Sequence, residues 1–255
     1  MENGGNIWST SLRIMKKEII YVLAYCAMIV VFLMIEEKME NTSASSIALT
    51  FASAMLAIPA HLSVLSRLGT ADAMRELQSK SPRYIGSFVF RTIVLGVISC
   101  APMLALVIFL SANNWGRTSL IATAVLVLLL SAALVFAKWG TMLPAIVMQS
   151  DKTFAAAGRR GRMSFFYAFP RLLVSFGLLS VVQILAIAAA ANMLGAGDSY
   201  FPAAGGFDFG LLLSAMIATA ISSYQIVMTA VILSRSYLRA ENAANCRDLV
   251  AVEAI

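Results

Sequence analysis

Acidic charge is scarce in this sequence, above all inside its apolar segments. Only 13% of the 255 residues are charged, against about 25% in soluble domains. No Asp or Glu lies well within any of the long apolar runs described below. Transporters coupled to protons or cations usually carry a carboxylate there, because a membrane-buried acid can bind and release the ion. The sequence therefore argues against transport coupled to protons or cations, whereas other kinds of transport stay open.

Cysteine and histidine are equally sparse. Cys26, Cys100 and Cys246 are isolated, with no CxxC spacing, so neither a disulfide framework nor a metal site is predicted. The single histidine, His61, is interpreted as a packed or interfacial residue, because no buried acid is present to complete a Ser-His-Asp set. HExxH, GxSxG and phosphate-loop motifs are missing as well. We expect neither an enzyme nor a bound cofactor.

Long apolar runs make up most of the chain, which is 60% hydrophobic with a mean hydropathy of +0.84. The runs cover residues 19–35, 45–66, 86–111, 119–148, 164–194 and 208–234. Each has about the 20 residues that a helix needs to cross roughly 30 Å of hydrocarbon. The sequence predicts an all-α polytopic membrane protein with six transmembrane helices.

The basic residues are divided unequally between the two sides of such a membrane domain. Fourteen of the 19 Lys and Arg fall on one side, two on the other, and three inside the predicted spans. By the positive-inside rule the basic side is cytoplasmic. Both termini are then cytoplasmic, which agrees with an even number of spans. The net charge of +6 is accounted for by this orientation and indicates no nucleic-acid partner.

Three regions follow from this pattern: an N-terminal segment (1–18), a membrane domain (19–234) and a cytoplasmic tail (235–255). In the first region Trp8, Leu12 and Met15 recur at helical spacing beside basic residues, which predicts a helix lying in the cytoplasmic interface. The alternative is a solvated tail. No signal-peptide cleavage site follows the first apolar run.

A weak internal repeat is visible in the middle of the chain. Pro59 and Pro144 each stand near the end of a predicted span, and an arginine follows each by 16 residues, at Arg75 and Arg160. A repeated unit would be a helix, an elbow on the membrane surface and a re-entering helix, with both copies running the same way through the membrane. The alternative is a chance match, since the shared elements are short.

Basic residues inside or beside the spans are the candidate binding groups. Those inside are Arg91, Lys138 and Arg171, and those just before the fifth span are Arg159, Arg160 and Arg162. The first three have no acid within the spans to pair with. They either snorkel to the headgroups or hold an anion such as a lipid phosphate, which the arginine fork fits well. The second three either bind an anionic surface or only fix the orientation.

Three neighbouring segments carry a family resemblance. Residues 138–147 contain a Leu-Pro-Ala turn, residues 155–162 form an Ala- and Arg-rich element, and residues 165–167 begin the next span with aromatics. This order resembles six-helix bacterial inner-membrane proteins related to the membrane domain found beside glycerophosphoryl diester phosphodiesterases. Gly161 stands where that family usually has a serine, and an acid often found after the proline is missing. The resemblance implies a membrane protein without known catalytic residues, tied to lipids or envelope organisation.

Taken together, these features predict a non-enzymatic multi-pass protein of the bacterial inner membrane. We expect a scaffold or accessory protein that contacts anionic lipid headgroups on the cytoplasmic side, with a membrane-protein partner or a second copy as further candidate partners. The alternative is a transporter or permease subunit with a cavity lined by Gln183, Asn192 or Gln225, although helix–helix hydrogen bonding is the default role of these residues.

Overall fold

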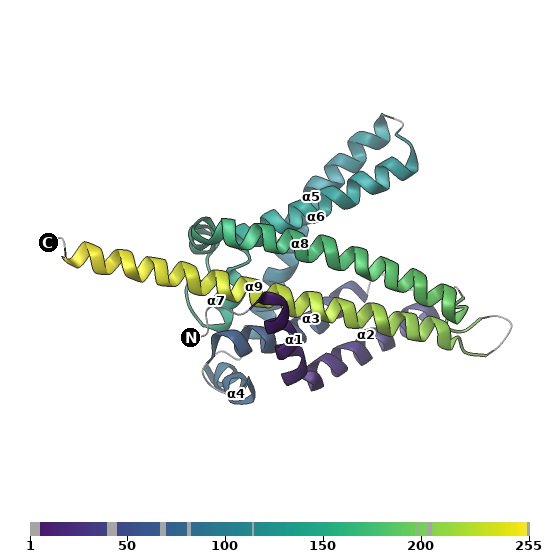
Figure 1. Cartoon of the computed structure of the whole chain (residues 1–255), viewed down its shortest axis with the longest axis horizontal. Coiled ribbons are helices and arrows are strands. Elements are labelled where there is room, and N and C mark those ends of the chain that lie inside the picture. The colour runs from purple at the N-terminus through teal and green to yellow at the C-terminus, as the bar shows by residue number, and fades with distance from the viewer. Residues whose placement is uncertain are drawn as a thin grey trace. The chain divides into compact units, whose positions relative to one another are not determined.

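The computed structural model of the chain describes residues 6–39, 45–66, 70–80, 83–113, 115–197, 199–202 and 206–253. Over these ranges the chain is helical and contains no strand, which confirms the predicted all-α class. The helices are α1 (Ile7–Lys17), α2 (Ile19–Met39), α3 (Ser45–Leu65), α4 (Thr70–Lys80), α5 (Tyr84–Ala112), α6 (Arg117–Trp139), α7 (Met142–Val147), α8 (Phe154–Leu194) and α9 (Phe209–Glu253) (Figure 1).

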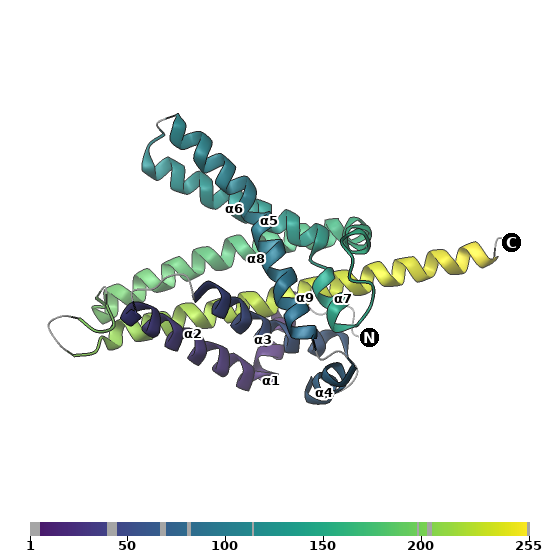
Figure 2. The ribbon, with the colours of Figure 1, turned by 180° about the vertical axis from the view of Figure 1, so that it is seen from behind.

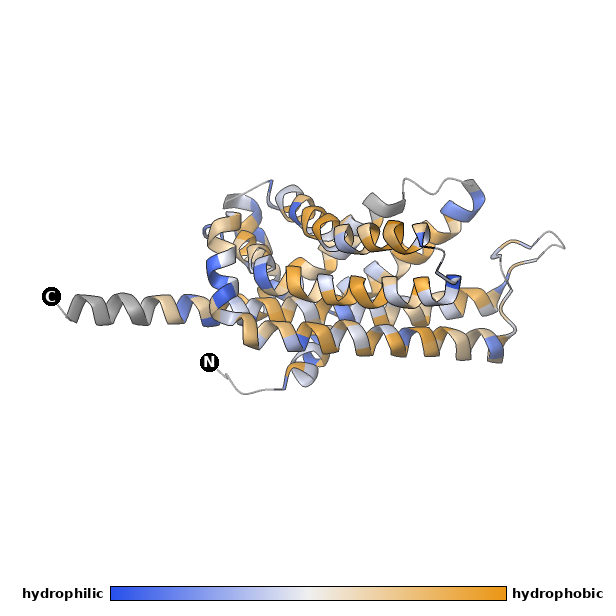
Figure 3. Cartoon of the chain, turned by 90° about the horizontal axis from the view of Figure 1, so that it is seen from above, coloured by the Kyte–Doolittle hydropathy of each residue, from blue (hydrophilic) through white to orange (hydrophobic). Residues whose placement is uncertain are grey.

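Five helical segments of the described chain are long and apolar enough to cross a membrane: α2, α5, α6 with α7, α8 and α9. The number rises to six if α3 and α4, bent by 107° at their junction, form one span. Figure 3 shows apolar residues along these helices and hydrophilic residues near their ends. A multi-pass helical membrane protein is therefore confirmed, whereas the orientation of its termini stays a prediction.

The helix ends differ from the predicted runs at three places. The run 119–148 is broken after Trp139, because a turn at Gly140 and Thr141 separates α6 from α7. Helix α8 begins ten residues earlier than the apolar run 164–194, since its first turns hold three alanines and three arginines, which are good helix formers. Helix α9 continues through most of the tail predicted at 235–255; residues 254–255 lie outside the described ranges, as do residues 1–5 of the N-terminal segment.

The chain forms two compact units, the first comprising residues 1–60 and 177–229. In this unit Asn6 caps α1, and the Tyr224 hydroxyl of α9 donates to the Trp8 carbonyl (3.1 Å). The buried face of α1 carries Ser11 and Ile14, while Leu12 is 51% exposed. The predicted helix is thus present, but the face with Leu12 is turned away from the unit.

The second unit comprises residues 61–176 and 230–255. Helices α5 and α6 form an antiparallel hairpin (Figures 1 and 2), held by a hydrogen bond from the Ser131 hydroxyl to the Ser99 carbonyl (2.6 Å). His61 is buried, as expected of a packed histidine; its Nδ1 lies 2.7 Å from the Ser234 hydroxyl and its ring meets Phe88 edge-on. Because both partners of the His61–Ser234 pair are buried, they join helices and are closed to a substrate.

Both segments that were predicted as elbows are helical. Helix α4 buries Ala73 and Leu77 and exposes Arg75, so it is amphipathic. The first turns of α8, seen nearly end-on in Figure 1, run in a different direction from the turns that follow in the same unit. The repeat that would relate the two elbows stays a prediction.

Candidate functional site: the basic surface around the start of α8

The connection from α7 to α8 is built by short polar side chains. The Asp151 carboxylate accepts the Thr153 backbone N–H (3.0 Å), and the Thr153 hydroxyl caps α8 by accepting the Ala156 N–H (3.2 Å). Hydrogen bonds from the Thr153 N–H and hydroxyl, helped by the charges of Arg160 and Arg159, hold the pKa of Asp151 below its usual value. Local hydrogen bonds thus fix the start of α8, where the arginines lie.

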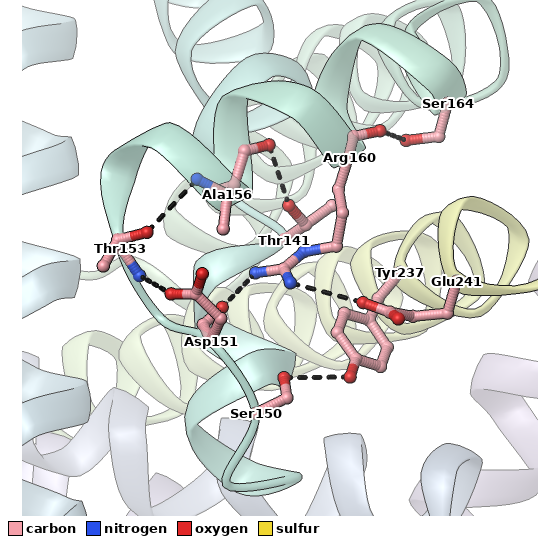
Figure 4. A network of polar contacts seen from close by, with 10 residues as sticks. Thr141, Ser150, Asp151, Thr153, Ala156, Arg160, Ser164, Tyr237 and Glu241 are labelled. Carbon is pink, nitrogen blue, oxygen red and sulfur yellow. Dashed lines mark hydrogen bonds and ion pairs between the residues drawn. The ribbon is translucent and has the colours of Figure 1, made fainter. Parts of the chain in front are cut away.

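Arg160 is the inward-facing arginine of this segment, and its side chain is 10% exposed. It pairs with Glu241 of α9 (3.3 Å), donates to the Asp151 carbonyl, and lies 5.2 Å from the ring centroid of Tyr237, whose hydroxyl bonds Ser150 (Figure 4). Arg160 therefore ties α8 to α9 and to the preceding loop. Among the predicted lipid contacts, it is the one that pairs with a carboxylate of the described chain.

Gly161 lets the next turn approach α6 closely. A Cβ at this position would overlap the carbonyl group of Lys138, which is backbone and has little freedom to move. Thr141 strengthens the same contact, since its hydroxyl donates to the Ala157 carbonyl (3.3 Å). This packing requires a residue without a side chain at position 161.

Six exposed cations lie on α6, α8, α9 and the α7–α8 connection of the same unit, and we call them the basic band. They are Lys138, Lys152, Arg159, Arg162, Arg171 and Arg239. None of them makes an ion pair within the described chain. Three lie over aromatic rings: Lys138 over Trp139 (4.4 Å to the centroid), and Arg171 and Arg239 over Tyr167 (4.1 and 3.8 Å).

Apolar side chains are exposed among these cations. Phe166 is 90% exposed and Met163 39% exposed, and both lie one helical turn after a band arginine on α8. Alternating exposed cations and large apolar groups are typical of a surface that lies at the boundary between headgroups and hydrocarbon.

Arg91 does not belong to the band. Its side chain is half-buried in α5, and its Nη1 is buried without a hydrogen-bond partner among the described residues. Among the described residues of the second unit, no hydrogen bond, ion pair or ring contact joins Arg91 to a band cation. The structure thus separates the six predicted arginines and lysines into four band members, one ion-paired residue and one isolated residue.

Three residues of this region were not predicted from the sequence. They are Arg239, Tyr167, whose ring lies under two cations, and Glu241, which pairs with Arg160. Glu241 lies 81 residues after Arg160 in the chain, and Arg239 lies 72 residues after Tyr167, so no local spacing could reveal the contacts. The sequence showed an aromatic start to the fifth span and a basic tail. It did not show that these two segments contact each other.

Two open cavities of the second unit flank this region. One of about 430 Å³ is lined by Asp151, Arg159, Arg160 and Glu241 together with small apolar residues, and another of about 410 Å³ by Leu62, Leu77, Glu76 and Gln149 among others. The polar residues proposed for a transport cavity line neither of them. Gln183 instead donates to the Ser222 hydroxyl (3.0 Å) across α8 and α9 in the first unit, which confirms its predicted helix–helix role.

No family model matches this chain, and no curated protein or solved structure proved similar to it. The resemblance to the membrane domain of phosphodiesterase-associated proteins therefore stays a prediction.

Proposed function

We propose that this protein is a non-enzymatic, multi-pass protein of the bacterial inner membrane that holds anionic lipid headgroups at its cytoplasmic side and serves there as a scaffold or accessory protein. The observation that carries the proposal is the basic band: six exposed cations without ion pairs in the described chain, with Phe166 and Met163 exposed between them.

Electrostatics and surface chemistry both support this function. Each Lys or Arg near an anionic bilayer surface gains about 1 kcal/mol, so a band of this size attracts acidic lipids strongly. The exposed phenyl group of Phe166 would insert below the headgroups that its charged neighbours contact. The positive-inside rule places the same surface in the cytoplasm. Arg160 is left out of the lipid-binding set because Glu241 neutralises it.

The test compares two double variants that remove the same charge. In Arg159→Gln with Arg162→Gln the band loses two cations; in Lys38→Gln with Arg117→Gln two exposed cations outside the band are lost. Native mass spectrometry of each protein, purified in mild detergent, counts the anionic lipids that stay bound.

We expect the band variant to retain several-fold less phosphatidylglycerol than wild type and the control variant to match wild type. Equal retention by all three proteins would overturn the proposed function. The same spectra report bound protein partners and the number of copies in each complex, which the scaffold role requires to exceed one chain.

A further inference from the structure

Charged groups of both signs line the open cavity of about 430 Å³ in the second unit. Arg159 and Arg160 of α8 contribute two cations, and Asp151 of the α7–α8 connection and Glu241 of α9 contribute two carboxylates. The formal charges of these four groups cancel. The rest of the lining consists of a serine, a methionine and alanines, so the charged groups decide which ligands the cavity accepts.

Both carboxylates have lone pairs left for a ligand. Arg160 Nη1 donates to Glu241 Oε1 (3.3 Å), while the second oxygen of this 38% exposed side chain accepts nothing from the described chain (Figure 4). The exposed Asp151 carboxylate accepts the Thr153 N–H on Oδ1 (3.0 Å). Hydrogen bonds from Thr153, helped by the two arginine charges, lower the pKa of Asp151, so it is ionised at neutral pH. Since a carboxylate offers about four lone-pair sites, both can accept a further donor.

The same cavity presents donors for an anion. Arg159 is exposed and makes no ion pair or hydrogen bond within the described chain. The Ser150 hydroxyl accepts from the Tyr237 hydroxyl (2.9 Å), which leaves its own hydrogen free to donate. A guanidinium fork binds phosphate oxygens in pairs. Donors for a phosphate group and acceptors for a cation therefore line one space.

The balance of charges selects against ligands of a single sign. A purely anionic group would be repelled by Asp151 and Glu241, and a purely cationic group by the two arginines. A zwitterion can place each of its ends against the opposite charge. The cavity therefore fits a molecule that carries an anion and a cation close together.

The carboxylates favour a primary ammonium as the cationic end. A primary ammonium carries three N–H donors, which two carboxylates can accept. A quaternary ammonium has no N–H and is usually held by aromatic rings. The nearby ring of Tyr237 already lies 5.2 Å from the guanidinium of Arg160. These contacts indicate an amine rather than a choline group.

The position of the cavity on α8 indicates a lipid headgroup. The cavity lies just before the apolar part of this helix, which is long and apolar enough to cross a membrane. Met163 lines the cavity and is 39% exposed, and Phe166, one turn further along α8, is 90% exposed. Apolar groups beside a charged cavity are typical of the boundary where headgroups meet hydrocarbon.

We propose that this cavity binds the headgroup of phosphatidylethanolamine, with the phosphate on Arg159 and Ser150 and the ammonium on Asp151 and Glu241. The inference rests on the proposed function, which brings headgroups to this surface, and adds a zwitterionic lipid with a defined site. Arg160 is a positioning residue here, because it holds Glu241 in the wall of the cavity. Arg162, which does not line the cavity, binds anionic headgroups by charge alone.

The first experiment removes one exposed carboxylate inside the cavity or one outside it. Delipidated wild type, Asp151→Asn and Asp72→Asn are titrated in mild detergent with phosphatidylethanolamine and, separately, phosphatidylglycerol, and bound lipid is followed by native mass spectrometry. Asp151→Asn should lose about fivefold in affinity for phosphatidylethanolamine and should bind phosphatidylglycerol at least as well as wild type. Asp72→Asn should match wild type with both lipids. Asparagine still accepts the Thr153 N–H, so thermal unfolding at neutral pH should show an intact fold.

The second experiment removes one of two neighbouring band cations. Arg159→Gln should lower the affinity for phosphatidylethanolamine about fivefold, whereas Arg162→Gln should lower it much less. Both variants should retain less phosphatidylglycerol, because both cations belong to the basic band. Phosphatidylcholine with the same acyl chains should bind wild type more weakly than phosphatidylethanolamine does, since its quaternary group offers the carboxylates no N–H.

Two results would overturn the site. One is an equal affinity for phosphatidylethanolamine in Asp151→Asn and Asp72→Asn, and the other is equal binding of the choline and ethanolamine lipids by wild type. Both would leave the proposed function standing, because its readout is the phosphatidylglycerol lost from the Arg159/Arg162 double variant. Free phosphoethanolamine separates the two sources of the headgroup. We expect it to displace the bound lipid only in large excess; complete displacement at equal concentration would assign the cavity to a soluble ligand and contradict the lipid site.

Discussion

The two compact units handle charge in opposite ways. In the first, the Glu37 carboxylate at the end of α2 accepts the Ser199 hydroxyl and the backbone N–H groups of Tyr200 and Phe201, and Asp208 accepts those of Gly197 and Leu211. In the second, the basic band meets rings and solvent but no carboxylate of the described chain. Glu37 and Asp208 are therefore satisfied by the fold, whereas the cations of the basic band are left for something outside it.

The same contrast is repeated on a smaller scale within the second unit. Arg160 is buried and paired with Glu241, while its neighbour Arg159 is exposed. A rotation of one residue along a helix, about 100°, separates a cation that holds helices together from one that is available to a ligand. Function in this region depends on which way α8 faces.

The largest expected effect comes from changing how closely α8 approaches α6. Gly161→Ala places a methyl group against the Lys138 carbonyl, so we expect a loss of about 3 kcal/mol in unfolding free energy, at the upper end of overpacking effects. Gly177→Ala in the same helix is the matched control, because its Cβ would meet nothing within 4 Å. Thermal unfolding in detergent measures both. Similar melting temperatures for the two variants would show that the close contact does not hold the helices.

A smaller loss of unfolding free energy should distinguish Arg160 from its neighbour Arg159. Arg160→Gln removes an ion pair with a partner that is 38% exposed and a hydrogen bond to the Asp151 carbonyl, for which we expect about 2 kcal/mol. Arg159→Gln should change unfolding by less than about 0.5 kcal/mol and should reduce lipid retention instead. If Arg159→Gln proved the more destabilising of the two, the assignment of structural and ligand-binding roles would be reversed.

The sequence was sufficient for the fold class because hydropathy and helix length are local properties. It was not sufficient for the site, because a run of arginines such as 159–162 does not reveal which member faces inward. That depends on Glu241 and Tyr237, which α9 brings from far along the chain. The break after Trp139 was missed for a similar reason, since the turn at Gly140 lies inside an unbroken apolar run.

The role of the hydrogen-bonded carboxylates in the first unit can be tested at Glu37. Glu37→Gln removes the charge that three donors share, so amide exchange at Tyr200 and Phe201 should become faster. Exchange in the second unit should stay unchanged, which serves as the internal control. Unaltered protection at both amides would mean that the loop is held without the carboxylate.

The smallest effect concerns acid sensitivity at the start of α8. Hydrogen bonds from Thr153 and the nearby arginine charges keep the pKa of Asp151 below its ordinary value of 3.8. A lowered carboxyl pKa stabilises the fold fully above the unfolded value, and this contribution is lost as the pH falls through the folded value. The unfolding free energy of Asp151→Asn should therefore fall less steeply with acid than that of wild type below about pH 4. The matched comparison is Asp72→Asn, which removes one exposed ion pair with Arg75. Parallel acid-unfolding curves for wild type and Asp151→Asn would show that Thr153 caps α8 without help from the carboxylate.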